Sequence, residues 1–350
     1  MKNKDILKKK LARKFNNEYS WRTKASKLIN KYNFDDKVIV ITGATNGIGL
    51  STVKALTKTK AIIYVLVRNT ALAQKRFLKC ANVNIIKMDL DSFDSIFNVV
   101  SYFRVKNIKI DYLINNAGVM GKHFEVDSQQ LEKHFKINYL SPFMLTNGLL
   151  PNLTPNSRII NLASVAHKWS RVHLEDPHFK KRKYNQKLGY GQSKTAIILF
   201  SSFLAKRLSN TNITVLSVHP GIIPFSNLWF PKNAILRIIV KSIISVLIFL
   251  QIHLLLNLLF CFINSNIVKN FKTNDQGAST TIYAMGESEL SKHTGIYLED
   301  CNAYPMMSEK IKRAYGLAPH ANNENLAKEL WRYTIKFFMN EPFFNSVFNS

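Results

Sequence analysis

Short apolar runs alternate with longer stretches of helical pattern along most of this sequence. Seven of these runs are candidates for buried strands: 37–42, 61–67, 83–88, 110–115, 158–162, 214–219 and 295–298. Most are separated by stretches that favour helices: 50–60, 92–103, 128–150 and 190–208. Because parallel strands need a crossover connection, usually a helix, this alternation predicts an α/β fold with one doubly wound parallel sheet of the Rossmann type.

The chain shows no internal repeat and no linker that would divide it, so we expect a single domain over 34–340. A basic extension, 1–33, precedes this domain, and a short tail, 341–350, follows it. An apolar insertion, 231–270, interrupts the alternating pattern before the last strand candidate and should lie near the substrate site.

The centre of the insertion, 242–263, has 22 residues without Lys, Arg, Asp or Glu. Its length and hydropathy suit a membrane span. A single crossing, however, would separate the strand candidate 295–298 from the rest of its sheet. We therefore expect a membrane-embedded hairpin or an interfacial helix, with Arg237, Lys241 and Lys269 at the lipid headgroups. The alternative is a buried lobe over a lipophilic substrate site.

The charge of the chain is strongly positive, since 49 Lys and Arg against 22 Asp and Glu give +27. No zinc finger, basic zipper or aromatic RNA-binding motif is present, so nucleic acid is not the expected partner. Leu7, Leu11 and Phe15 recur every four residues among lysines, which predicts either a short basic amphipathic helix on a membrane surface or a solvated tail. This opening stretch has no apolar run of signal-peptide length. We expect an intracellular protein on the cytosolic face of an organelle membrane, not a secreted one.

The cysteines and histidines favour neither disulfides nor a metal. The three cysteines are odd in number and widely spaced, which suits a reducing compartment. His167, His173 and His178 are irregularly spaced with few carboxylates between them, so we expect no metal site.

The first strand candidate ends in a glycine-rich turn, Gly43-Ala-Thr-Asn-Gly-Ile-Gly49, that leads into a helical stretch. Gly43 permits a tight turn, Gly47 lets the backbone approach a pyrophosphate, and Gly49 lets the helix pack on the strand. The free N–H groups of the helix N-terminus would bind the phosphates. The spacing T-G-x-x-x-G-x-G differs from the G-x-G-x-x-G of long-chain dehydrogenases and resembles the short-chain dehydrogenase/reductase family.

Further motifs similar to those of this family occur in the family's order, from about residue 34 to about residue 298. They are Asp89-Leu90, Asn115-Asn-Ala-Gly118, Asn138, Ser164, Tyr190-Gly-Gln-Ser-Lys194 and His219-Pro-Gly221. The resemblance implies a catalytic tetrad of Asn138, Ser164, Tyr190 and Lys194, with Ser164 also contacting the substrate. It also implies cofactor contacts from Gly43, Thr45, Asn46, Gly47, Ile48, Gly49, Arg68, Asp89, Leu90, Asn116, Ala117, Gly118, Tyr190, Lys194, Pro220, Gly221 and Ile223.

Tyr190 and Lys194 are four residues apart on a predicted helix, so both project from one face. The pKa of tyrosine is normally near 10, and a nearby ammonium together with a cationic nicotinamide should lower it. Tyr190 would then be the acid in carbonyl reduction or the base in alcohol oxidation. Ser164 would hydrogen-bond the substrate oxygen, and Lys194 would also hold the nicotinamide ribose. Asn138 would fix a water that links Lys194 to solvent.

Cofactor choice depends on the end of the second strand, where an acidic residue would bind the ribose 2′-hydroxyl and indicate NAD. Here Val67 is followed by Arg68, whose guanidinium suits the 2′-phosphate of NADP. NADP(H) is therefore favoured, and NAD(H) is the alternative, in which Arg68 is an ordinary surface arginine. One position departs from the family, since Phe225 stands where a threonine often contacts the nicotinamide, and Ser226 is the candidate substitute.

Two segments, 164–167 and 275–283, resemble retinol dehydrogenases, and two others, 219–227 and 295–301, resemble the oxidoreductase part of WW-domain oxidoreductases, although no WW domain is present. We therefore expect a membrane-associated NADP-dependent enzyme acting on CH–OH groups of a lipophilic alcohol or carbonyl compound, such as a retinoid, steroid or other lipid. The alternative is a catalytically weak or inactive Rossmann-fold protein that senses cofactor or binds other proteins. The reaction direction and the oligomeric state, including a homodimer, stay open.

Overall fold

The computed structural model describes residues 15, 17–121, 123–223, 242, 271–304, 306, 316–341, 345 and 347. Three sequence predictions lie outside these residues: the basic amphipathic helix with Leu7 and Leu11, the apolar segment 242–263 apart from residue 242, and the contribution of Phe225 or Ser226. Among the described residues, no helix combines the length and hydropathy needed to cross a membrane.

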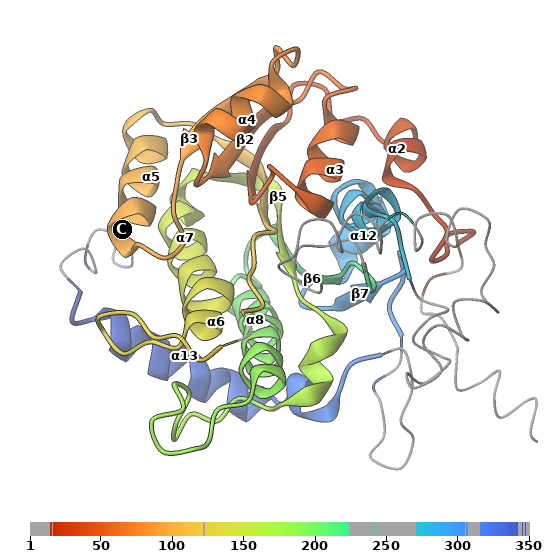
Figure 1. Ribbon diagram of the computed structural model, residues 1–350. Coiled ribbons are helices and arrows are strands. Elements are labelled where there is room, and N and C mark those ends of the chain that lie inside the picture. The colour runs from red at the N-terminus through yellow and green to blue at the C-terminus, as the bar shows by residue number, and fades with distance from the viewer. Residues whose placement is uncertain are drawn as a thin grey trace, which may run out of the picture.

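Within the described residues, seven parallel strands form one sheet in the order β3-β2-β1-β4-β5-β6-β7. They are β1 (Val38–Thr42), β2 (Ile62–Val67), β3 (Val83–Lys87), β4 (Ile110–Asn115), β5 (Leu153–Leu162), β6 (Thr214–His219) and β7 (Tyr297–Glu299). The chain builds outward from β1 to β3, returns to place β4 beside β1, and then continues to β7 (Figure 1). This reversal confirms the predicted doubly wound fold, and such a switch point is where these folds bind ligands.

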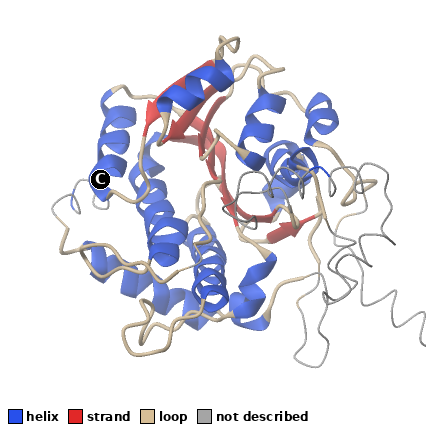
Figure 2. Cartoon of the chain, in the orientation of Figure 1, coloured by secondary structure: helices blue, strands red, loops and turns tan. Residues whose placement is uncertain are grey.

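Helices cover both faces of the sheet (Figure 2). The α-helices are α2 (Ala25–Leu28), α3 (Gly47–Leu56), α4 (Thr70–Phe77), α5 (Phe93–Val105), α6 (Lys133–Phe135), α7 (Ser141–Leu149), α8 (Gln186–Arg207), α12 (Asn274–Gly286) and α13 (Glu324–Phe338). Shorter turns are η1 (Ile29–Lys31), the π-helical η2 (Lys136–Leu140), η3 (Leu150–Asn152), η4 (Val165–Trp169), η5 (Ser288–Lys292) and η6 (Pro319–Asn322). Residues of β1 alternate between two cores: Val40 joins α5, α7, α8 and α13, whereas Ile39 and Ile41 join α2, α3, α4 and α12.

Two helices begin at positions other than those predicted, and both changes affect the site. The predicted helix 128–150 starts only at Lys133, because the Glu132 carboxylate caps it by accepting the Phe135 N–H. The predicted helix 190–208 starts earlier, at Gln186, where the side chain of Asn185 is the cap. Tyr190 consequently lies a full turn inside α8, on rigid helical backbone.

Part of the basic N-terminal stretch belongs to the folded body. Helix α2 packs on α3 and α12, and its residues Ala25 and Leu28 are buried. The N–H and the hydroxyl of Ser26 both donate to the Asp275 carboxylate, over 2.9 and 2.6 Å. These contacts attach the start of the described chain to α12, the helix that follows the apolar insertion.

Candidate active site

The glycine turn joins β1 to α3 and has almost no room for side chains. Gly43 has a φ of +71°, and a Cβ at this position would lie 2.8 Å from the Cα of Ala117. A Cβ at Gly49 would lie 2.4 Å from both the Asn116 side chain and the Gly43 carbonyl oxygen. Helix α3 begins at Gly47 without a capping bond from the Asn46 side chain, which suits the binding of an anionic phosphate by its first N–H groups.

The Asn115–Gly118 motif locks this turn against β4. The Asn116 side chain donates to the carbonyl oxygens of Thr42 (2.8 Å) and Gly43 (3.1 Å). In return, the Thr42 hydroxyl accepts the N–H groups of Asn116 (3.1 Å) and Ala117 (2.9 Å). The turn is thus held rigid by four hydrogen bonds from one neighbouring loop.

The residues predicted to contact the adenosine half of a dinucleotide follow β2 and β3 at the same edge of the sheet. Arg68 is exposed directly after β2, and its guanidinium makes no hydrogen bond or ion pair with another described residue. Asp89 follows β3, and its carboxylate accepts the Asp91 N–H over 3.0 Å. Leu90 beside it is buried. Arg68 and the Asp89 turn therefore follow the carboxyl ends of two paired neighbouring strands, β2 and β3.

Tyr190, Lys194 and Ser164 converge at the carboxyl end of β5. Tyr190 and Lys194 are both buried on α8, and the Lys194 ammonium lies 5.7 Å from the centre of the Tyr190 ring. Ser164 caps η4 after β5, where its Oγ accepts the Ala166 N–H over 3.2 Å, and it lowers the pKa of the nearby Tyr190. Lys194 donates to the carbonyl oxygen of Leu162 over 2.8 Å, so the ammonium is fixed by the strand that carries Ser164.

The electrostatics of this group differ from the sequence expectation. Burial raises the pKa of Tyr190 to about 12, and the hydrogen bond from Ser164 opposes this only in part. Burial also lowers the pKa of Lys194 to about 8. The expected lowering of the tyrosine pKa by Lys194 is therefore not produced by the protein groups, because desolvation dominates and the ammonium turns to Leu162. Tyr190 carries its proton at neutral pH.

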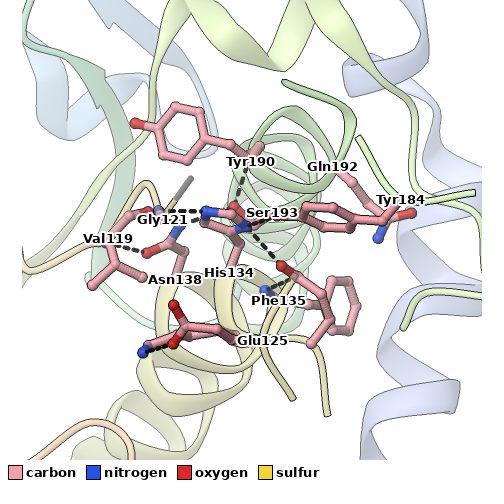
Figure 3. Close-up of polar contacts among 12 residues, drawn as sticks. Val119, Gly121, Glu125, His134, Phe135, Asn138, Tyr184, Tyr190, Gln192 and Ser193 are labelled. Atoms are coloured by element: carbon pink, nitrogen blue, oxygen red, sulfur yellow. Dashed lines mark hydrogen bonds and ion pairs between the residues drawn. The ribbon is translucent and has the colours of Figure 1, made fainter. Parts of the chain in front are cut away.

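Asn138 lies in the π-helical turn η2, and its amide is bonded to protein groups (Figure 3). Its oxygen accepts the Val119 N–H (2.8 Å), and its nitrogen donates to the Val119 carbonyl oxygen (2.9 Å) and the Ser193 hydroxyl (3.0 Å). A Cβ at Gly118 would lie 3.2 Å from the Asn138 oxygen and 3.4 Å from the Lys194 nitrogen. Asn138 and Lys194 thus both lie next to Gly118, and the water between Asn138 and Lys194 stays a prediction.

The turn His219-Pro220-Gly221 closes the site from β6. The Nδ1 atom of buried His219 accepts the N–H groups of Val165 (3.3 Å) and Gly221 (3.4 Å), which ties this turn to the segment after Ser164. Gly221 has a φ of +90°, and a Cβ there would lie 2.6 Å from the Lys272 side chain. Ile223, also a predicted cofactor contact, is buried just beyond.

Several residues around Tyr190 were not singled out by the sequence. The His134 ring lies 5.9 Å from the Tyr190 ring, and the Trp169 ring lies 6.3 Å from it. Tyr184, from the segment between Ser164 and Tyr190, packs its ring 4.9 Å from the partly exposed Phe124. These aromatic side chains are far apart in sequence, so no local motif identifies them.

The three histidines considered for a metal are held apart by separate partners. His167 accepts the Ala318 N–H, His173 pairs with Glu175, and the Nδ1 of His178 accepts the Glu132 N–H. Within the part of the chain that the structure describes, no three His, Cys, Asp or Glu side chains form a group that could hold a metal ion.

Comparison with known proteins agrees with the fold and the site residues described above. A family model described as short chain dehydrogenase matches residues 37–233, more than half of the chain. Retinol dehydrogenase 12 of Mus musculus is 31% identical over 303 residues, which are 84% of each chain. The chloroplastic short-chain dehydrogenase TIC 32 A of Brassica napus is 30% identical over 324 residues, 87% of this chain and 89% of the relative. The chain belongs to the short-chain dehydrogenase/reductase family of oxidoreductases.

Solved structures share the fold at lower sequence identity. An uncharacterized protein from Mycobacterium Paratuberculosis superposes with a TM-score of 0.66 at 24% identity, covering 89% of this chain and 97% of that one. BdcA, solved in complex with NADPH, gives a TM-score of 0.54 at 19% identity, covering 75% and 92%. Both likenesses show the Rossmann-type fold of this chain.

Proposed function

We propose that this protein is an NADP(H)-dependent oxidoreductase that moves a hydride between the nicotinamide and a lipophilic alcohol or carbonyl compound. The observation that carries the proposal is the convergence of Ser164, Tyr190 and Lys194 at the carboxyl edge of the sheet. The rigid glycine turn and the His219–Gly221 turn lie at the same edge. A dinucleotide on the glycine turn would bring its nicotinamide toward Tyr190.

The chemistry of the site follows from the proton state of Tyr190. The nicotinamide supplies or accepts the hydride when it is bound. Tyr190, which is protonated at neutral pH, donates its hydroxyl proton to the substrate oxygen in carbonyl reduction. Ser164 hydrogen-bonds the same oxygen and, since it lowers the pKa of Tyr190, also stabilises the phenolate that remains. The buried setting strengthens both interactions because it excludes water.

The choice of NADP(H) rests on Arg68. No acidic residue follows β2 at the position that would bind a ribose 2′-hydroxyl. The exposed guanidinium is not committed to a described protein group, so it is available for a bidentate contact with a 2′-phosphate. BdcA, which shares the fold, was solved in complex with NADPH, and this supports the proposal.

A lipophilic substrate fits the aromatic surroundings of Tyr190. Trp169 and His134 flank the Tyr190 ring, and the Phe124–Tyr184 pair extends this side of the site toward solvent. Phe124 is 45% exposed, so the pair presents apolar surface to solvent. The relative retinol dehydrogenase 12 is named for a lipophilic alcohol.

Membrane association is the second part of the proposal. Ile222 and Phe271 form a β-bridge, and the Lys272 N–H donates to the Ile222 carbonyl oxygen over 2.9 Å. The chain therefore leaves and re-enters the folded body at one point, as a hairpin in the membrane requires, and the sequence between contains the apolar segment 242–263. We expect the protein to sediment with membranes and to need detergent, not alkaline carbonate, for release. Full solubility without detergent would favour the buried lobe instead.

The assay for the function mixes the detergent-solubilised protein with NADPH or NADH and a panel of retinal, a steroid ketone and medium-chain aldehydes. Loss of the absorbance of reduced nicotinamide, faster with NADPH than with NADH, is the expected result. Tight NADPH binding without turnover of any carbonyl would instead favour the cofactor-sensing alternative.

A further inference from the structure

A buried Glu–His pair adjoins the site and takes no part in the chemistry proposed above. The Glu132 side chain is 1% exposed and that of His134 is 2% exposed, and the Oε1 and Nδ1 atoms are 2.6 Å apart. Both residues lie where the loop after β4 enters α6, and His134 points toward Tyr190 (Figure 3). Burial of such a pair requires that every polar atom finds a partner.

The hydrogen-bond partners of His134 define which ring nitrogen carries the proton. Its Nε2 accepts the Gly121 N–H over 2.9 Å, so this nitrogen carries no proton. The single ring proton is therefore on Nδ1 and is donated to Glu132, whose other carboxylate oxygen accepts the Phe135 N–H over 2.8 Å. Glu132 fixes both the tautomer and the orientation of the ring.

The strip 119–121 is what His134 holds. The Asn138 side chain binds both the N–H and the carbonyl oxygen of Val119, and the His134 ring accepts the N–H of Gly121. Three hydrogen bonds from the single helical segment 133–140 therefore attach this strip, which continues from the glycine beside the Lys194 ammonium. The strip therefore runs from Gly118, beside Lys194, to the Gly121 N–H that His134 accepts.

The pair also contacts the backbone that carries Tyr190. A Cβ at Gly189 would lie 3.3 Å from Nδ1 of His134 and 3.4 Å from Oε1 of Glu132. The Tyr184 hydroxyl lies 3.2 Å from Nδ1 of His134, so the aromatic side of the site reaches the same pair. The pair is thus enclosed between the strip 119–121 and the residue preceding Tyr190.

We propose that His134, oriented by Glu132, is a positioning residue that fixes the strip 119–121 as a substrate-binding wall and so sets the affinity for the carbonyl substrate. This inference rests on the proposed function. It assigns to His134 no contact with the cofactor and no proton transfer.

Three substitutions separate the parts of this role. H134N keeps a donor at the Nδ1 position for Glu132 but is too short to accept the Gly121 N–H, whereas H134Q reaches Gly121. H134F removes both bonds with little change in size. We expect KM for the carbonyl substrate to rise about tenfold in H134N and H134F, the effect of one lost hydrogen bond, and to recover in H134Q. The turnover number and the dissociation constant of NADPH should change less than about threefold.

The matched control is H173N, the same substitution at a half-buried histidine that pairs with Glu175 through Nδ1, and it should leave KM unchanged. Hydrogen exchange of a peptide covering 116–121 measures the strip without any turnover, and its protection should fall in H134N but not in H134Q or H173N. Unchanged protection or unchanged KM in H134N would overturn the inference. Equal losses of substrate affinity, NADPH affinity and thermal stability would also overturn it, because they indicate general misfolding. If the wild-type protein turns over no carbonyl substrate, the proposed function is refuted. The hydrogen exchange of the 116–121 peptide then tests by itself whether His134 fixes the strip.

Discussion

Replacing Glu299 by glutamine should change how the stability of the fold depends on pH. Glu299 ends β7 and is 3% exposed, and its carboxylate accepts the Gly316 N–H. Burial raises the pKa of this carboxyl from 4.5 to about 7, and the nearby Lys168 ammonium opposes the rise only in part. The folded protein therefore binds this proton more tightly than the unfolded chain does.

The sign and size of the effect follow from the two pKa values. Below the ordinary value of 4.5, Glu299 is protonated in both states and contributes no pH dependence. As the pH rises from there to about 7, the unfolded chain loses its proton first, so stability falls, and above that value the loss is complete. A difference of about 2.5 between the pKa values corresponds to about 3 kcal/mol.

Urea denaturation at pH values from about 5 to about 8 measures this loss directly. Glutamine retains an acceptor for the Gly316 N–H without ionising, so the free energy of unfolding of E299Q relative to wild type should rise by about 2–3 kcal/mol across that range. E289Q, at an exposed carboxylate paired with Lys292, should show no such rise. A flat difference between E299Q and wild type would refute the reasoning, because it would mean that Glu299 ionises in the fold without penalty.

Two further predictions concern the cofactor. R68A should weaken the binding of NADPH by about 1.5–3 kcal/mol, the scale of a charge-assisted hydrogen bond, and should barely affect the binding of NADH. Titration of the protein with each cofactor measures both affinities. Equal losses for the two cofactors would mean that Arg68 does not bind the 2′-phosphate. G49A should abolish cofactor binding and lower the melting temperature, because its Cβ would lie 2.4 Å from the backbone oxygen of Gly43, whereas a G49A protein with normal affinity would show that the turn is not rigid.

The fold was predictable because its signals are local. Each strand is a short apolar run, and residues such as Ile39, Val40 and Ile41 are buried from both sides, which produces a continuous rather than an alternating pattern. The glycine turn and the Tyr190–Lys194 spacing are likewise contained in a few consecutive residues. Order along the chain was then sufficient to place these groups at one edge of a parallel sheet.

The rest depends on contacts between distant segments. The predicted helix 128–150 begins late, at Lys133, because Glu132 caps Phe135 and pairs with His134 inside the fold, and no periodicity reveals that choice. The pKa of Tyr190 in the protein alone depends on burial by the whole fold, which the neighbouring Lys194 in the sequence does not reveal. The packing of Ala25 on α12 was also hidden, because the lysines around it dominate the pattern.

The substitution Y190F tests the proposed chemistry most directly, because it removes one hydroxyl and leaves the buried ring in place. Turnover of the best carbonyl substrate with NADPH should fall by about 100-fold or more, while the dissociation constant of NADPH stays close to that of wild type. Y102F, at an exposed tyrosine on α5, provides the matched control and should keep full activity. Near-normal turnover in Y190F would contradict the assignment of Tyr190 as the proton donor and, with it, the mechanism proposed for this site.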